Sequence, residues 1–148
     1  MLLHASITVM ACPFFRPTKP AADWEPAPRV PLGAPYYGWC AAGETLHAPD
    51  AHRIREVCNF GYARTRCPWF PETMKVDAYR YTLRKTANGE WRVIWVAESQ
   101  YAPAAFGELR LGSGAEVLAN GAPEPVQWQA RAFVEAEWRK RGNASNSI

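Results

Sequence analysis

The clearest alternation of hydrophobic and polar positions lies in the middle of the chain. Residues 76–85 and 90–97 are rich in aromatic and β-branched side chains, and both runs alternate with a period of two. Asn88-Gly89 lies between them, which is a strong signal for a β-turn. The pattern therefore predicts an antiparallel hairpin over residues 76–97.

The length of this turn determines which side chains share a face. With Asn88-Gly89 as a two-residue turn, Leu83 pairs with Ile94 and Tyr81 pairs with Val96. The expected core face then carries Tyr79, Tyr81, Leu83, Ile94 and Val96, and the other face carries Arg80, Thr82, Arg84, Thr86, Trp91, Val93 and Trp95. A shift of register by one residue would exchange the faces of one strand.

The C-terminal third predicts further strands and one long helix. A third strand is expected around residues 106–111 and a weaker one around 116–118. A helix is expected from Pro125 to about Arg141, followed by a frayed polar tail over 142–148. Its apolar stripe consists of Val126, Ala130, Phe133, Val134 and Trp138.

The N-terminal half has a different pattern, because proline interrupts it throughout. Residues 12–39 contain seven prolines, which predicts irregular, extended backbone anchored by interspersed aromatic residues. A short helix is expected over about residues 50–60, with Asp50 as its N-cap and Gly61 at its C-terminal end.

These elements predict an α+β fold in a single domain of 148 residues. The expected architecture is a small antiparallel β-sheet, made of the hairpin and one or two further strands, with a C-terminal helix. Residues 10–72 form a loop-rich, cysteine-containing half, and residues 73–141 form the sheet and the helix. We expect the first half to need a staple, since irregular backbone makes few hydrogen bonds of its own.

Composition and charge exclude few classes of function. The chain has thirteen arginines and four lysines against fourteen acidic residues, which gives a net charge of +3. This charge is too small to indicate nucleic-acid binding by itself. No segment has the ~20 apolar residues of a membrane helix. Residues 1–12 lack the basic start of a secretion signal, and Met10 is an alternative start. We therefore expect a cytoplasmic protein with reduced thiols.

Cysteine usage is the main functional signal. Cys12, Cys40, Cys58 and Cys67 all lie in the first 67 residues, and none follows. Four thiolates are the ligand count of a tetrahedral metal ion or of one iron–sulfur cluster. The spacing contains no close C-x2-4-C pair of the kind that builds structural zinc sites.

Two of these cysteines precede a proline, at Cys12-Pro13 and Cys67-Pro68. In this motif the chain resembles cysteine-ligated [4Fe–4S] proteins, in which a ligand run ends with Cys-Pro. The resemblance is confined to these motifs, and the wide spacing matches no ferredoxin pattern. It implies one [4Fe–4S] cluster bound by all four cysteines, with Arg16, Arg64 and Arg66 as candidate compensating charges.

Two alternatives to a cluster stay open. Zinc would be favoured if His47 or His52 replaced one cysteine as a ligand. The cysteines could also be free or disulfide-paired thiols that pack as small apolar side chains.

A cluster with four cysteine ligands has no open iron, so we expect a structural, electron-transfer or redox-sensing role, with a redox protein as a candidate partner. The chain contains no G-x-S-x-G, no phosphate-binding glycine loop and no converging carboxylate pair. No catalytic residue is therefore predicted, and a non-enzymatic role is favoured. An enzyme with its active site between the two halves is a third, weaker alternative.

A second candidate site is the hairpin face that carries Arg80, Arg84, Trp91 and Trp95. Arginine beside tryptophan on a sheet can stack bases and bind phosphates, so a zinc-stapled module that binds nucleic acid or protein is the alternative function. The competing interpretation is that the cysteine-containing half covers this face and buries both indoles.

Overall fold

The computed structural model describes residues 9–21, 36–86, 88–119 and 121–146, and it has the predicted α+β fold. A five-stranded antiparallel sheet has the order β1-β4-β5-β6-β7, and β2 and β3 form a separate two-stranded sheet. The elements are β1 (Val9–Ala11), β2 (Phe15–Pro20), β3 (Tyr36–Cys40), α1 (Ala51–Arg53), the π-helical turn η2 (Ile54–Cys58), β4 (Ala78–Lys85), β5 (Trp91–Ser99), β6 (Ala102–Leu111), β7 (Val117–Ala119) and α2 (Glu124–Asn146).

The predicted hairpin is present as β4 and β5, but its register differs from the predicted one by one residue. Leu83 pairs with Val93 and Tyr81 pairs with Trp95. The cause is a longer loop: Thr86 donates its amide to the carbonyl of Glu90 at 2.8 Å, which leaves three residues between them. Gly89 takes the left-handed conformation, with φ of +84°, that such a loop requires.

This register reverses the predicted faces of β5. Trp91 and Val93 face the core and are 2% and 0% exposed. Ile94 and Val96 lie on the outer face instead, where both are half-buried. The strand keeps its alternation, and a one-residue shift moves its whole side-chain set to the other side of the sheet.

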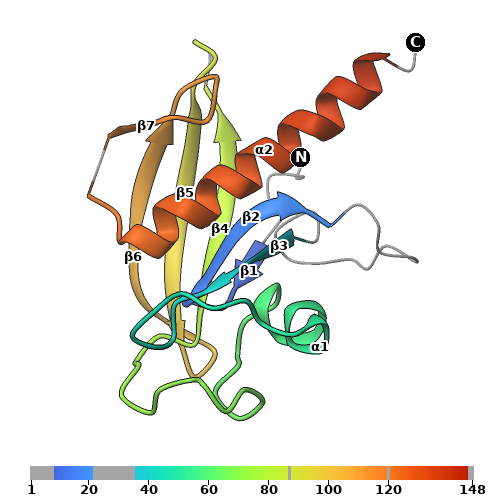
Figure 1. The fold of residues 1–148 in the computed structure, drawn as a ribbon. Coiled ribbons are helices and arrows are strands. Elements are labelled where there is room, and N and C mark those ends of the chain that lie inside the picture. The colour runs from blue at the N-terminus through green and yellow to red at the C-terminus, as the bar shows by residue number, and fades with distance from the viewer. Residues whose placement is uncertain (1–8, 22–35, 87, 120, 147–148) are drawn as a thin grey trace.

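Helix α2 packs across the inner face of the sheet (Figure 1). Its buried stripe contains four of the five predicted residues, namely Val126, Ala130, Phe133 and Val134, whereas the side chain of Trp138 lies outside the described part of the chain. The helix continues to Asn146, so the prediction of a frayed tail from residue 142 is wrong for residues 142–146. Gly142 lies inside the helix. A glycine at such a position costs about 1 kcal/mol relative to alanine, which is not enough to end the helix.

The N-terminal half is more regular than the prolines suggested. Residues 12–39 were expected to be irregular, yet β2 and β3 pair within them, and β1 joins the main sheet beside β4. Pro17 and Pro20 lie in β2, a strand of a two-stranded sheet, where a missing amide donor costs little. The aromatic and proline residues expected to anchor segment 22–35 lie outside the described residues.

The short helix expected near residues 50–60 is present as α1 and η2. The Asp50 side chain accepts the amide of Arg53 at 2.8 Å, as predicted for an N-cap. The helix ends in a π-helical turn at Cys58, and Gly61 follows with φ of +88°. None of the described helices is both long and apolar enough to cross a membrane.

Candidate metal centre

The four cysteines, which are far apart in the sequence, line one small cavity. Cys12 follows β1, Cys40 ends β3, Cys58 ends η2, and Cys67 lies in the loop before β4. Cys12, Cys40 and Cys58 are buried, and Cys67 is half-buried. All four are free thiols, so no disulfide joins them in this structure.

The rest of the cavity wall is largely apolar. It includes the side chains of Phe14, Phe15, Val57, Trp69 and Phe70. Arg53 is the one charged residue of this wall among the described residues, and its guanidinium lies 4.6 Å from the centre of the Trp69 ring. The sulfur atoms are therefore the main ligand atoms that this cavity offers.

The cavity itself is small. Its volume of about 20 Å³ is close to the space that one water molecule occupies. No group of three or more His, Cys, Asp or Glu side chains in the described ranges is arranged to hold a single metal ion. Zinc bound to thiolates at about 2.3 Å brings its ligand sulfurs to within ~3.8 Å of one another. The cysteines thus share a cavity without forming a compact tetrahedral site.

Backbone hydrogen bonds fix the segment of each cysteine, and one of them joins two cysteines directly. The amide of Cys12 donates to the carbonyl of Cys58 at 3.2 Å, which joins the turn after β1 to the end of η2. Cys40 and His47 exchange two backbone hydrogen bonds of 2.7 and 3.0 Å. Cys67 donates its amide to Ala63 at 2.8 Å, within its own loop. The backbone bonds of Cys67 are thus confined to its own loop, whereas those of Cys12 and Cys40 reach other segments.

Two buried amide side chains, which sequence reasoning missed, anchor these segments. Gln129 of α2 donates to the carbonyls of Cys12 and Phe15 at 2.8 Å each, and it accepts the hydroxyl of Tyr81 at 2.7 Å. Both Gln129 and Asn59 are 0% exposed. In the sequence, Gln129 lies beside the apolar stripe of α2, and a polar residue at such a position is the signal that could have revealed it.

Asn59 connects the end of η2 to β3. Its side chain donates to the carbonyl of Ile54 at 2.8 Å and to that of Tyr36 at 3.1 Å, and it accepts the amide of Tyr36 at 3.2 Å. Because Asn59 directly follows Cys58, these bonds place Cys58 close to the strand that carries Cys40. Asn59 is thus a positioning residue for the cavity.

Burial governs the protonation of the thiols. Burial, together with smaller contributions from the neighbouring thiols Cys40 and Cys67, raises the pKa of Cys12 to about 12. Burial also raises the pKa of Cys40 and, more strongly, that of Cys58. Arg16 lowers the pKa of Cys12 and Cys40, although this effect is smaller than that of burial. Because their pKa values are raised, the thiols of Cys12, Cys40 and Cys58 are neutral at pH 7 in the folded protein without a bound cation.

Only one of the three predicted compensating arginines acts on the thiols in this way. Arg16 is 8% exposed, and it forms an ion pair with Glu124 at 2.8 Å. Arg64 instead pairs with Asp77 at 2.8 Å and lies over the ring of Phe70. Arg66 is exposed.

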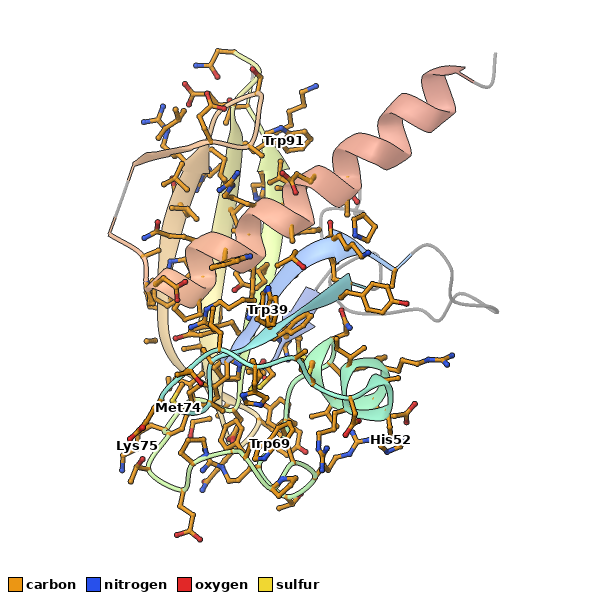
Figure 2. The ribbon with its side chains drawn as sticks, in the orientation of Figure 1. Trp39, His52, Trp69, Met74, Lys75 and Trp91 are labelled. Atoms are coloured by element: carbon orange, nitrogen blue, oxygen red, sulfur yellow. The ribbon has the colours of Figure 1, made fainter. Side chains whose placement is uncertain are left out.

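The two histidines considered as zinc ligands differ in position. His52 is exposed, and Figure 2 shows it on the outer side of the helical segment. His47 lies opposite Cys40, and its ring is 4.3 Å from that of Trp69, edge to face. Its buried Nε2 atom has no hydrogen-bond partner among the described residues. His47 is nevertheless not among the residues that line the cavity.

The predicted Arg/Trp face does not exist as one surface. Because of the register of β4 and β5, Trp91 and Trp95 face the core side, whereas Arg80 and Arg84 lie on the outer side. Trp95 packs on Gly107, where an added Cβ would come within 2.7 Å of the indole. Arg80 forms an ion pair with the buried Glu98. These four residues therefore do not form the single face that the predicted nucleic-acid site requires.

The comparisons with known proteins give no relative from which a role can be transferred. The chain matches no protein-family model, no curated protein and no solved structure. The functional argument therefore rests on the cysteine cavity.

Proposed function

We propose that the protein binds one [4Fe–4S] cluster through Cys12, Cys40, Cys58 and Cys67. The observation that carries this proposal is that four separate segments each bring one cysteine to the same cavity. Wide sequence separation suits a cluster, since its ligands bind different iron atoms and can come from distant segments. The bound group would supply one-electron chemistry or a structural cross-link.

The chemistry of the donor set fits this group. The cavity offers four sulfur atoms in apolar surroundings, and Arg16 supplies a buried positive charge nearby. A cluster with four thiolate ligands carries a net negative charge, which a buried guanidinium would offset. A volume of about 20 Å³ is too small for a cluster, so binding would require the cavity to widen.

The loop of Cys67 is the segment that would move most easily. Cys67 is half-buried, and its own backbone bonds are turn bonds to Ala63 and Phe70. Cys12, Cys40 and Cys58 are each tied to another element or to a distant part of the chain. An outward shift of this loop would enlarge the cavity while the other three cysteines stay in place.

Since all four cysteines would be ligands, no iron would remain open to a substrate. The role that follows is a structural, electron-transfer or redox-sensing one. A structural role is favoured by the position of the site, because it would join β3, η2 and the loop before β4 into one unit.

A zinc site is the second candidate, and one observation favours it. His47 lies beside Cys40 and has an unpartnered buried Nε2 atom that a metal could use. Three cysteines and His47 would then be the ligands. This candidate requires a larger rearrangement of the side chains, because His47 does not line the cavity.

Elemental analysis distinguishes these outcomes. The protein is purified without oxygen, and iron, acid-labile sulfide and zinc are measured per chain. About four iron and four sulfide per chain would support the cluster. One zinc without iron would replace it by the second candidate. A chain that remains metal-free after anaerobic reconstitution with iron and sulfide, and also after incubation with zinc, would refute both.

A further inference from the structure

One edge of the main sheet is unpaired over most of β6. On one side β6 pairs with β5 along its length, and on the other side β7 pairs only with Arg110 and Leu111. Figure 1 shows β6 along the left side of the sheet, with the short β7 at its upper end. Within the described ranges, no strand pairs with residues 102–109 on this side. In this stretch, the backbone donors and acceptors of alternate residues, which point away from β5, are available to another strand.

Most side chains along this edge are exposed and uncharged. Residues 102–106 are all exposed, and the side chain of Phe106 is 80% exposed. No charged residue occurs from Tyr101 through Gly107. The first charged side chain, Glu108, is already paired with Arg92 of the same sheet at 2.9 Å.

The features that protect natural sheet edges occur at only one end of this stretch. Pro103 lacks an amide donor, and the register shifts next to it, where Ala97 pairs with Ala105 but Glu98 pairs with Pro103. Residues 105–109 follow in regular pairing with β5 and contain no proline and no lysine, and the charge of Glu108 within them is balanced by Arg92. An exposed, neutral edge of this kind favours pairing with another strand.

We propose that this edge binds the same edge of a second copy of the chain, in an antiparallel arrangement about a two-fold axis. In such a dimer each strand faces itself, and with the axis at Phe106 the single charged residue of the stretch 102–109, Glu108, lies opposite Ala104 of the second copy, so no like charges meet. The two five-stranded sheets would continue into one across the axis.

The outer face of the sheet supports a second copy over an unrelated peptide. Phe106 pairs with Val96, and Ile94 lies two residues away from Val96 on the same face of β5, so these three side chains form an apolar row from β5 to the edge. In the dimer this row would continue into that of the partner, and the two Phe106 side chains would lie near the axis. An unrelated peptide would need side-chain pockets for specificity, which the small Ala104 and Ala105 side chains do not form.

The test compares two substitutions of an exposed hydrophobic residue by lysine. Phe106→Lys places two like charges near the axis, whereas Leu46→Lys makes the same change at a position that is 51% exposed in the cysteine-containing half. The molar mass of each protein is measured by light scattering and analytical ultracentrifugation over a range of concentrations. We expect wild type and Leu46→Lys to dimerise alike, and Phe106→Lys to weaken the dimer at least tenfold.

A wild-type protein that stays monomeric up to its solubility limit would overturn the proposal. So would a dimer that Phe106→Lys leaves unchanged, since the contact would then lie elsewhere. Amide hydrogen exchange gives a second readout: residues 105–109 should exchange more slowly in the dimer than in the monomer. Unchanged exchange in this segment would also refute pairing at this edge. Circular dichroism checks that both variants are folded.

Discussion

The two halves of the molecule position their side chains by different means. In β4, β5 and β6, continuous ladders determine which face of the sheet each side chain lies on. Over residues 36–77, short elements are held by single bonds from buried amides such as Asn59 and by backbone bonds between distant segments. The strands of the sheet are thus aligned by many repeated bonds, whereas the cysteine cavity depends on a few specific contacts.

The largest effect is expected in the sheet. Trp91 is 2% exposed and packs in the core, so Trp91→Ala should lower the free energy of unfolding by about 3–5 kcal/mol. Trp39→Ala is the matched control, because Trp39 is 43% exposed. In Figure 2, Trp91 lies at the opposite end of the molecule from Trp69. Urea denaturation followed by circular dichroism measures both variants.

An equal loss of stability in Trp91→Ala and Trp39→Ala would show that the register described for β4 and β5 is incorrect. In the alternative register, with Ile94 and Val96 on the core face, Trp91 would be on the outer face and its removal would cost little.

The contact between the two halves is tested by Gln129→Ala. This substitution removes one hydrogen bond from each of the carbonyls of Cys12 and Phe15 and one from the Tyr81 hydroxyl, although the Cys12 carbonyl still accepts the amide of Phe15 at 3.0 Å. A buried polar group left unsatisfied costs about 1–3 kcal/mol. We expect the free energy of unfolding to fall by about 2–4 kcal/mol, since water or a small shift of the backbone can replace some of the lost hydrogen bonds. Arg131→Ala on the exposed side of α2 is the control and should change stability by less than about 0.5 kcal/mol.

The free energy of unfolding can be followed by the same urea titration. If both variants unfold like the parent, Gln129 does not anchor the turn that carries Cys12.

A smaller, pH-dependent effect is expected for the metal-free protein. The pKa of Cys12 rises from its ordinary 9.0 to about 12 in the folded state, and that of the fully buried Tyr81 also rises well above its ordinary value. Below pH 9 both groups are protonated in the folded and in the unfolded chain, so the free energy of unfolding does not change with their titration. Above it the unfolded chain loses protons that the folded chain retains, and folding becomes less favourable by about 1.4 kcal/mol per pH unit for each group.

Thermal melting of the metal-free protein between pH 7 and 11 measures this dependence. Stability should be nearly constant up to about pH 9 and should then fall. In a Cys12→Ala variant the fall should be less steep, because one of the contributing groups is absent. A melting temperature that rises with pH above 9 would contradict the sign of this prediction.

The pattern of hydrophobic and polar residues was sufficient to predict the hairpin and the buried stripe of α2. It failed at the register, because the Asn-Gly pair does not reveal that Thr86 and Glu90 close a longer loop. With one more residue in the loop, both strands are still present, but the side chains of β5 that were expected on the core face lie on the outer face instead.

Predictions for the N-terminal half failed for another reason. The prolines predict irregular backbone, yet Pro17 and Pro20 lie within the small sheet of β2 and β3. The cysteine count predicted a shared site, and all four cysteines do line one cavity. The anchors Gln129 and Asn59 could not be predicted, since their roles depend on contacts between segments distant in the sequence.

The iron content of single-cysteine variants tests most directly whether the four cysteines form one ligand set. Cys12→Ser, Cys40→Ser, Cys58→Ser and Cys67→Ser are purified without oxygen beside the parent, and iron and sulfide are measured per folded chain. We predict that each substitution lowers the iron and sulfide content well below that of the parent. A parent that binds a cluster and a variant that retains its full content would contradict a site built from all four residues.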